Sequence, residues 1–139
     1  MARNGAMILS APLIRMAAGG GAAFWVANLA ISRTRIAAEY RAALSISYWP
    51  MIGASLAGGL LIGLLVSYGL LRFYDRIPTA SPVTKAVILC VLVLIMATVA
   101  LGLPATRATS GDAWRYFLIG TLINLVRILA LGVAVGWLY

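Results

Sequence analysis

Residues 51–71 read MIGASLAGGLLIGLLVSYGLL, a run of 21 residues without a charged side chain. Aromatic residues flank this run, with Tyr48 and Trp49 before it and Phe73 and Tyr74 after it. An α-helix of about 20 apolar residues crosses the hydrocarbon core of a bilayer, and aromatic side chains gather at the two membrane interfaces. The run therefore predicts a transmembrane helix.

Three further apolar runs have lengths that suit a membrane crossing. One follows Ser81 and Pro82 and ends before Pro104, which are start and stop signals for a helix. The last run contains Arg127 but has aromatic residues at both ends. We expect an all-α integral membrane protein with a single transmembrane domain over residues 1–139. The expected spans are approximately 12–32, 51–71, 84–103 and 116–138.

The composition agrees with a membrane protein. Hydrophobic residues make up 63% of the chain and charged residues 10%, and the mean hydropathy is +1.02. A soluble fold of this size leaves too much surface in water to hide such a sequence. The formal net charge is +8, but the basic residues separate apolar runs, so we expect them to meet a bilayer with anionic lipids and not nucleic acid. The arginines expected at lipid headgroups are Arg33, Arg35, Arg41, Arg72 and Arg76.

Residues 33–47 form a predicted amphipathic segment between the first two spans. Ile36, Tyr40 and Leu44 recur at intervals of four, which is helical spacing. Pro50 disfavours helical backbone in Trp49, so we expect a break near Tyr48. The segment is either an interfacial helix or an extension of the first helix that packs on a neighbouring subunit or loop.

The distribution of basic residues leaves the membrane orientation open. We expect a multi-pass protein of the cell membrane, in which the side with more Lys and Arg faces the cytoplasm. Arg3, Arg15, Arg72, Arg76 and Lys85 fall on one side, and Arg33, Arg35, Arg41, Arg107 and Arg115 on the other. This balance permits insertion in both directions, and it also suits a subunit that its partners orient or a chain with a miscounted span.

Small residues at four-residue spacing predict where the helices pack closely. In lipid, helices associate through close backbone approach and interhelical hydrogen bonds, because there is little hydrophobic gain. The second span carries the longest such ladder, and shorter ones occur in the first and fourth spans. The residues concerned are Ser55, Gly59, Gly63 and Ser67, then Gly19 and Ala23, and finally Gly132 and Gly136. The spacing does not say whether the partner helix belongs to the same chain or to another.

Arg127 is the residue most in need of a partner, because it lies near the middle of the fourth span. Asn124 lies three residues before it on the same helical stripe, and Asn28 is the amide of the first span. If these two helices are neighbours, the amide oxygens, or backbone carbonyls freed at Gly19–Gly21, can accept hydrogen bonds from the guanidinium. The site is then an intramembrane polar contact, a contact to a subunit or lipid, or an anion or substrate site; alternatively, Arg127 reaches along its helix to an interface.

The chemistry available to the chain is narrow. It has no histidine, one cysteine, and three acids, which are Glu39, Asp75 and Asp112 and all fall in predicted loops. We expect no metal site, no cofactor and no enzyme activity. The expected function is that of a non-catalytic accessory subunit that scaffolds a membrane assembly, through other membrane subunits or self-association. The alternative is a minimal oligomeric channel or transporter for an anion or small solute.

Overall fold

The structure, a computed structural model, describes residues 10–102 and 113–139, and all of its regular structure there is helical. The elements are α2 (Ala11–Ser32), α3 (Arg35–Ala43), α4 (Tyr48–Phe73), the 3-10 turn η1 (Tyr74–Arg76), α5 (Pro82–Ala97), the π-helical turn η2 (Thr98–Gly102) and α7 (Ala113–Leu138). Four of them, α2, α4, α5 and α7, are long and apolar enough to cross a membrane. The predicted fold class is therefore confirmed, and the chain is a multi-pass membrane protein.

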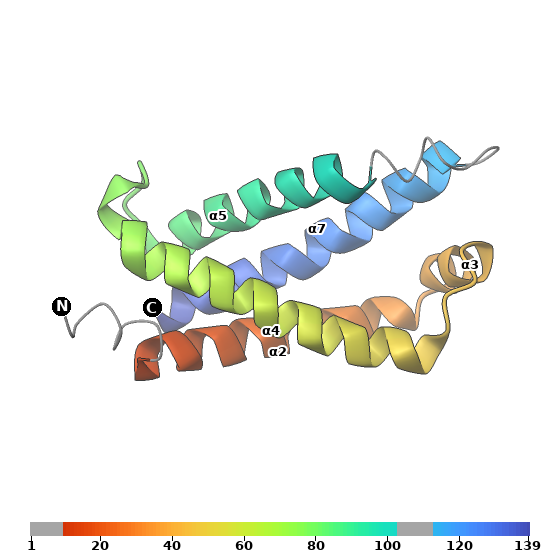
Figure 1. Ribbon diagram of the computed structural model, residues 1–139, viewed down its shortest axis with the longest axis horizontal. Coiled ribbons are helices and arrows are strands. Elements are labelled where there is room, and N and C mark those ends of the chain that lie inside the picture. The colour runs from red at the N-terminus through yellow and green to blue at the C-terminus, as the bar shows by residue number, and fades with distance from the viewer. Residues whose placement is uncertain (1–9, 103–112) are drawn as a thin grey trace.

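The four long helices form two pairs that diverge towards one end of the molecule. α4 packs on α2, α2 packs on α7, and α7 packs on α5, whereas α4 and α5 have few contacts with each other. Figure 1 shows α2 with α4 and α5 with α7 as two pairs that spread apart towards the end where α3 lies. The start of α2, the end of α7 and the turn between α4 and α5 lie together at the opposite, narrow end.

The narrow end holds most of the buried core. Met16, Leu70, Cys90 and Leu131 come from the four long helices, and each is at most 1% exposed. Glycines bring these helices close together: a Cβ atom added at Gly136 would lie 2.4 Å from the Cα atom of Val83.

The connection between α2 and α4 differs from the prediction in its bounds. A separate helix forms only over Arg35–Ala43, because Thr34 caps its start by accepting a hydrogen bond from the Ala37 N–H at 3.3 Å. The helix therefore occupies only part of the predicted amphipathic segment 33–47, since Ser45 has a left-handed φ of 55° in the turn that follows. α4 begins at Tyr48, and Pro50 lies in its first turn, where no intrahelical N–H bond is needed.

The triple glycine of the first span does not open the backbone. α2 runs unbroken from Ala11 to Ser32, so the suggestion that carbonyls freed at Gly19–Gly21 accept from Arg127 is wrong. These glycines instead let neighbouring side chains approach closely, with Gly20 against Val135 and Gly21 against Leu60.

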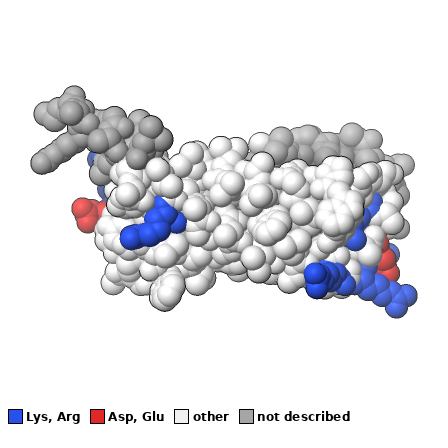
Figure 2. Space-filling model, turned by 90° about the horizontal axis from the view of Figure 1, so that it is seen from below, with Lys and Arg blue, Asp and Glu red and all other residues white. Residues whose placement is uncertain are grey.

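Apart from Arg127, the charged side chains of the described residues belong to the ends of the long helices and to the segments that join them. On the face drawn in Figure 2, blue and red atoms occupy the ends and leave a broad uncharged band between them. Trp49 and Trp114 are exposed near one end of the helices, and Trp137 and Tyr139 near the other. This arrangement is typical of a protein whose apolar band lies in a bilayer with aromatic residues at its edges.

Candidate functional site

Arg127 lies deep within α7. It is the fifteenth residue of a 26-residue helix, which places it about 21 Å from one helix end and about 17 Å from the other at 1.5 Å per residue. Its backbone therefore lies near the middle of the span, and its guanidinium contacts Asn28, which lies four residues before the end of α2. A cation at the centre of a membrane helix costs roughly 2.5 to 3.5 kcal/mol on insertion scales unless something polar compensates it.

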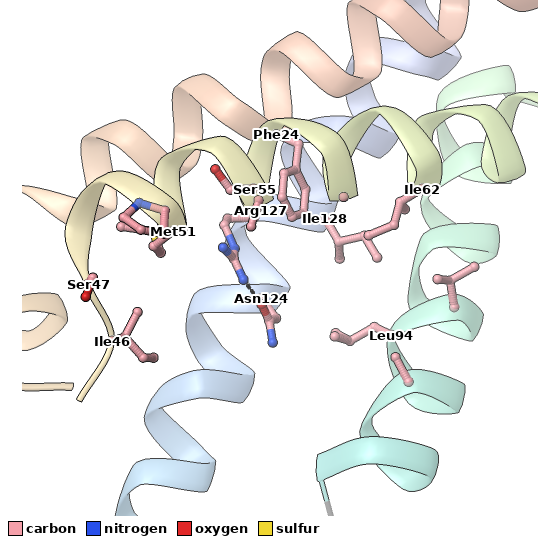
Figure 3. A pocket seen from close by; sticks show the side chains of 15 residues that line it. Phe24, Ile46, Ser47, Met51, Ser55, Ile62, Leu94, Asn124, Arg127 and Ile128 are labelled. Atoms are coloured by element: carbon pink, nitrogen blue, oxygen red, sulfur yellow. Dashed lines mark hydrogen bonds between the residues drawn. The ribbon is translucent and has the colours of Figure 1, made fainter. Parts of the chain in front are cut away.

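Two amide side chains hold the guanidinium. Nη1 of Arg127 donates to Oδ1 of Asn28 at 2.7 Å, and Nη2 donates to Oδ1 of Asn124. The second of these bonds is the dashed line in Figure 3. Asn124 precedes Arg127 by one turn of α7, whereas Asn28 comes from α2, so only the first bond joins two helices.

Asn28 is the hub of this polar contact. Its side chain is 3% exposed, and while Oδ1 accepts from Arg127, Nδ2 donates to Oγ of Ser55 at 3.0 Å and to Sδ of Met51 at 3.3 Å. Ser55 Oγ in turn donates to the carbonyl of Ile52 at 2.8 Å. The network therefore connects α2, α4 and α7 through one amide, whose orientation is fixed because the guanidinium can only donate.

The positive charge itself has no acidic partner in residues 10–102 and 113–139. The ion pairs described there join Glu39 to Arg35 and to Arg115, at 3.6 and 3.9 Å, and none reaches Arg127. The ring of Phe24 lies 4.9 Å from the guanidinium carbon and provides a cation–π contact. Nε of Arg127 is buried, and no hydrogen-bond partner is present for it in the described part of the chain.

A large apolar cavity opens beside Arg127, between the diverging helices α4 and α5. Its volume is about 660 Å³, within the range of roughly 300 to 1,000 Å³ that is usual for ligand pockets. Figure 3 shows Arg127 and Asn124 of α7 beside this space, with Phe24, Ile62 and Leu94 around it. Its remaining walls come from the start of α4 and from the end of α5.

A second, smaller cavity of about 210 Å³ lies beneath α3. It is more polar, because Asn28, Ser32, Tyr40 and Arg41 line it together with Arg127 and Asn124. Both cavities are lined by Ile46, Met51, Asn124 and Arg127. The guanidinium therefore lies where a polar space and an apolar space adjoin.

Tyr40 is a member of the site that the sequence did not identify as one. α3 places its ring against Gly120 of α7, where an added Cβ atom would lie 2.6 Å from the phenol oxygen. Burial raises the pKa of the Tyr40 phenol, and the positive charge of Arg127 opposes the rise. Helical spacing alone did not indicate this contact, because the turn at Thr34 before α3 sets the direction in which Tyr40 points.

The predicted packing residues lie at helix contacts within one chain. Gly59 and Gly63 of the α4 ladder face α2, where an added Cβ atom at Gly63 would lie 2.8 Å from the Ala17 carbonyl oxygen. Ser55 and Ser67 are buried on the same face of α4. Gly19 faces Leu138 of α7, Ala23 is half-buried, and Gly132 and Gly136 face α5.

Four of the five arginines expected at lipid headgroups are exposed at the ends of the molecule, and their contact with lipid stays a prediction. These four are Arg33, Arg35, Arg72 and Arg76. Arg41 differs because it is half-buried: its Nη1 donates to the Ser32 carbonyl at 3.1 Å, and its guanidinium carbon lies 4.9 Å from the Tyr48 ring. Arg3, Arg107 and Asp112 lie outside the described residues.

Lys85 is also buried, although the sequence placed it at the membrane edge. Its side chain is 5% exposed, and Nζ donates to the Tyr74 carbonyl at 2.6 Å while lying 3.6 Å from the Tyr74 ring centre. A lysine in the first turn of a helix gave no sequence signal for this contact, which depends on η1 folding back over α5.

No protein-family model, curated protein or solved structure matches the chain. Conclusions about function therefore rest on the geometry around Arg127.

Proposed function

We propose that this chain is a small, non-catalytic subunit of the cell membrane that scaffolds or stabilises a membrane assembly, as part of a hetero-complex or of a homo-oligomer. One observation carries the proposal: the charge of Arg127 has neutral amide partners and lies beside the opening between α4 and α5. An acidic group from another membrane component would complete the contact.

The energetics favour such a counterpart. Hydrogen bonds to the two amides engage Nη1 and Nη2 of the guanidinium, but they leave its full positive charge in a region of low dielectric constant. A carboxylate or phosphate that reaches Arg127 forms a charge-assisted hydrogen bond, which is roughly twice as strong as a neutral one. Within residues 10–102 and 113–139, the cavity linings supply amide, hydroxyl and guanidinium groups and no carboxylate, so we expect the acidic group to come from another component.

α5 is the helix with the most surface available for another component. Only 17% of the residues in its apolar stretch are buried, compared with 28% to 33% in the other three spans. Leu92, Ile95 and Met96 are each more than half exposed. Lipid can cover this face, but the face also borders the opening that leads to Arg127, which suits a subunit that contacts its partner through α5.

Native mass spectrometry of the chain purified in mild detergent tests this function. We expect wild-type protein to carry a protein partner or a second copy, and Arg127→Gln to lose most of it. Arg115→Gln is the matched control, because it removes a cation from the same helix at a side chain that is 61% exposed and outside both cavities. A wild-type chain that is purely monomeric, or an assembly that Arg127→Gln leaves intact, would contradict the proposal.

The second candidate is a minimal oligomeric channel or transporter for an anion or small solute. The observation that favours it is that Arg127 lines both cavities, since a guanidinium beside open space attracts anions. Flux measurements in proteoliposomes separate the two functions. A transport site predicts that Arg127→Gln assembles normally and loses flux, whereas the subunit function predicts a loss of assembly.

A further inference from the structure

The two cavities that adjoin at Arg127 differ in chemistry in the way that the two ends of an amphiphile differ. The cavity beneath α3 is lined by two guanidinium groups, Arg41 and Arg127, together with the phenol of Tyr40 and the amides of Asn28 and Asn124. The cavity between α4 and α5 is lined mainly by apolar side chains, including Phe24, Ile62, Val93, Leu94 and Ile128.

We infer that these cavities together bind one amphiphilic anion, a lipid with a single hydrocarbon chain and a phosphate or carboxylate headgroup. The headgroup lies beneath α3 beside Arg127 and Arg41, and the chain lies between α4 and α5. This inference rests on the proposed function, because it names the source of the acidic group that reaches Arg127.

Charge complementarity carries the assignment of the headgroup. Two cationic hydrogen-bond donors, Arg41 and Arg127, line the smaller cavity, and none of its lining residues in the described part of the chain is acidic. An anionic oxygen accepts from such donors, whereas the quaternary ammonium of a zwitterionic headgroup would be repelled by them. Guanidinium groups suit phosphate and carboxylate because their planar donors match two oxygens at once.

The volume of the larger cavity suits one hydrocarbon chain. If a methylene group takes about the room of a water molecule in the liquid, roughly 30 Å³, then 660 Å³ holds about 22 such groups. This is enough for one long hydrocarbon chain and too little for two. Because a chain is in an apolar medium both in the bilayer and in the cavity, the headgroup rather than the chain decides which lipid binds.

The experiment titrates the delipidated full chain in nonionic detergent with two lipids that share one oleoyl chain, and native mass spectrometry counts the adducts. Oleoyl lysophosphatidic acid provides the anionic headgroup, and oleoyl lysophosphatidylcholine provides the zwitterionic one. We expect a single anionic lipid per chain, bound about tenfold more tightly than the zwitterionic lipid, as charge-assisted hydrogen bonds imply. Equal binding of the two lipids would overturn the inference.

Variants locate the bound lipid. Arg127→Gln and Arg41→Gln should each abolish the preference for the anionic lipid, and Arg115→Gln should keep it. Ala54→Phe fills the larger cavity from α4 and should weaken binding of both lipids, whereas Ala57→Phe, on an exposed position outside the cavity lining, should not. This second pair keeps the test decisive if Arg127→Gln fails to fold. Binding that Ala54→Phe and Arg41→Gln leave unchanged would contradict the assignment.

Inorganic phosphate, added alone as a competitor, distinguishes a lipid from a free anion. We expect millimolar phosphate to displace little of the anionic lipid. If phosphate displaced all of it and Ala54→Phe had no effect on binding, the site would take a free anion. That result would overturn the inference. Failure of the inference is separable from failure of the proposed function. If protein assembly needs Arg127 but no lipid adduct forms, only the lipid site is contradicted. If a lipid adduct forms on a chain that has no protein partner, only the assembly role is contradicted.

Discussion

The guanidinium of Arg127 and the side-chain amide of Asn28 form a 2.7 Å hydrogen bond between α7 and α2, although 99 residues separate them in the sequence. The same amide donates to Ser55 of α4. Three transmembrane helices, α2, α4 and α7, therefore meet at a single polar contact.

Replacing Asn28 by alanine should loosen this junction. The change removes a hydrogen bond to a charged group and leaves the guanidinium with one amide partner, so we expect the free energy of unfolding to fall by about 1.5 to 3 kcal/mol. Asn124→Ala is the matched control, and it should cost less because its bond lies within α7 and joins no helices. Unfolding in mixed micelles, followed by circular dichroism, measures both; an equal or larger loss for Asn124→Ala would count against Asn28 as the hub.

The glycines of α4 should tolerate an added methyl group only where they do not face the backbone of α2. Gly63→Ala would place a Cβ atom 2.8 Å from a backbone carbonyl oxygen of α2, which forces the helices apart and should cost about 1 to 3 kcal/mol. Gly53→Ala meets nothing within 4 Å, and it should be neutral or stabilising by up to about 1 kcal/mol because alanine favours helix. The same unfolding measurement tests the pair, and two variants of equal stability would show that the ladder does not pack as described.

Lys85 should contribute to stability at the narrow end. Lys85→Met removes the 2.6 Å bond to the Tyr74 carbonyl and leaves that carbonyl only the longer 3.4 Å bond from the Ile77 N–H. Loss of a hydrogen bond from a charged group costs about 1.5 to 3 kcal/mol. Arg76→Met, at an exposed cation of the same end, should stay within about 0.5 kcal/mol of wild type. Thermal unfolding of the two variants in detergent provides the comparison. The contact would be unimportant if both variants unfolded like wild type.

Tyr40 gives the stability a dependence on alkaline pH. Because burial raises its pKa above the ordinary value of 10.0, the folded protein keeps the phenol proton more tightly than the unfolded chain does. Stability is therefore complete below about pH 10 and falls as the pH rises from there through the folded pKa. Tyr40→Phe has no phenol to ionise and should lose less stability between about pH 9 and about pH 11 than wild type does. Identical pH profiles for the two proteins would exclude Tyr40 as the cause.

Much of the fold was predictable because bilayer thickness constrains it. Length and hydropathy identify α4 without ambiguity, and the same criteria accept α7 despite Arg127, since its aromatic ends and its length agree. The neighbouring position of Asn124 also follows from helical spacing alone. To predict the hydrogen bond between Arg127 and Asn28, one must also assume that the first and fourth helices are adjacent. The sequence raised this adjacency as a condition and did not decide it.

The parts that escaped prediction depend on tertiary geometry. The periodicity of Gly59 and Gly63 predicts a packing face, but it does not identify α2 as the partner. The turn at Thr34 and the left-handed Ser45 rotate α3 so that Tyr40 faces Gly120, and no local pattern reports this rotation. The cavities arise because the helix pairs diverge from a tightly packed end, and the crossing of helices far apart in sequence sets that angle.

The most direct measurement is the reaction of a thiol in the cavity with charged reagents. Ala54 lines the space between α4 and α5, and Ala57 lies on the same helix outside it. Each is replaced by cysteine in a chain that also carries Cys90→Ala, which removes the buried native thiol. Purified protein is treated with an anionic sulfonatoethyl or a cationic trimethylammonioethyl methanethiosulfonate. We predict that Ala54→Cys reacts much faster than Ala57→Cys, and that Arg127→Gln lowers its anionic-to-cationic rate ratio about tenfold, because a guanidinium beside the cavity attracts anions. An unreactive thiol in the Ala54→Cys variant, or a ratio that Arg127→Gln leaves unchanged, would contradict the claim that Arg127 presents its charge to an accessible cavity.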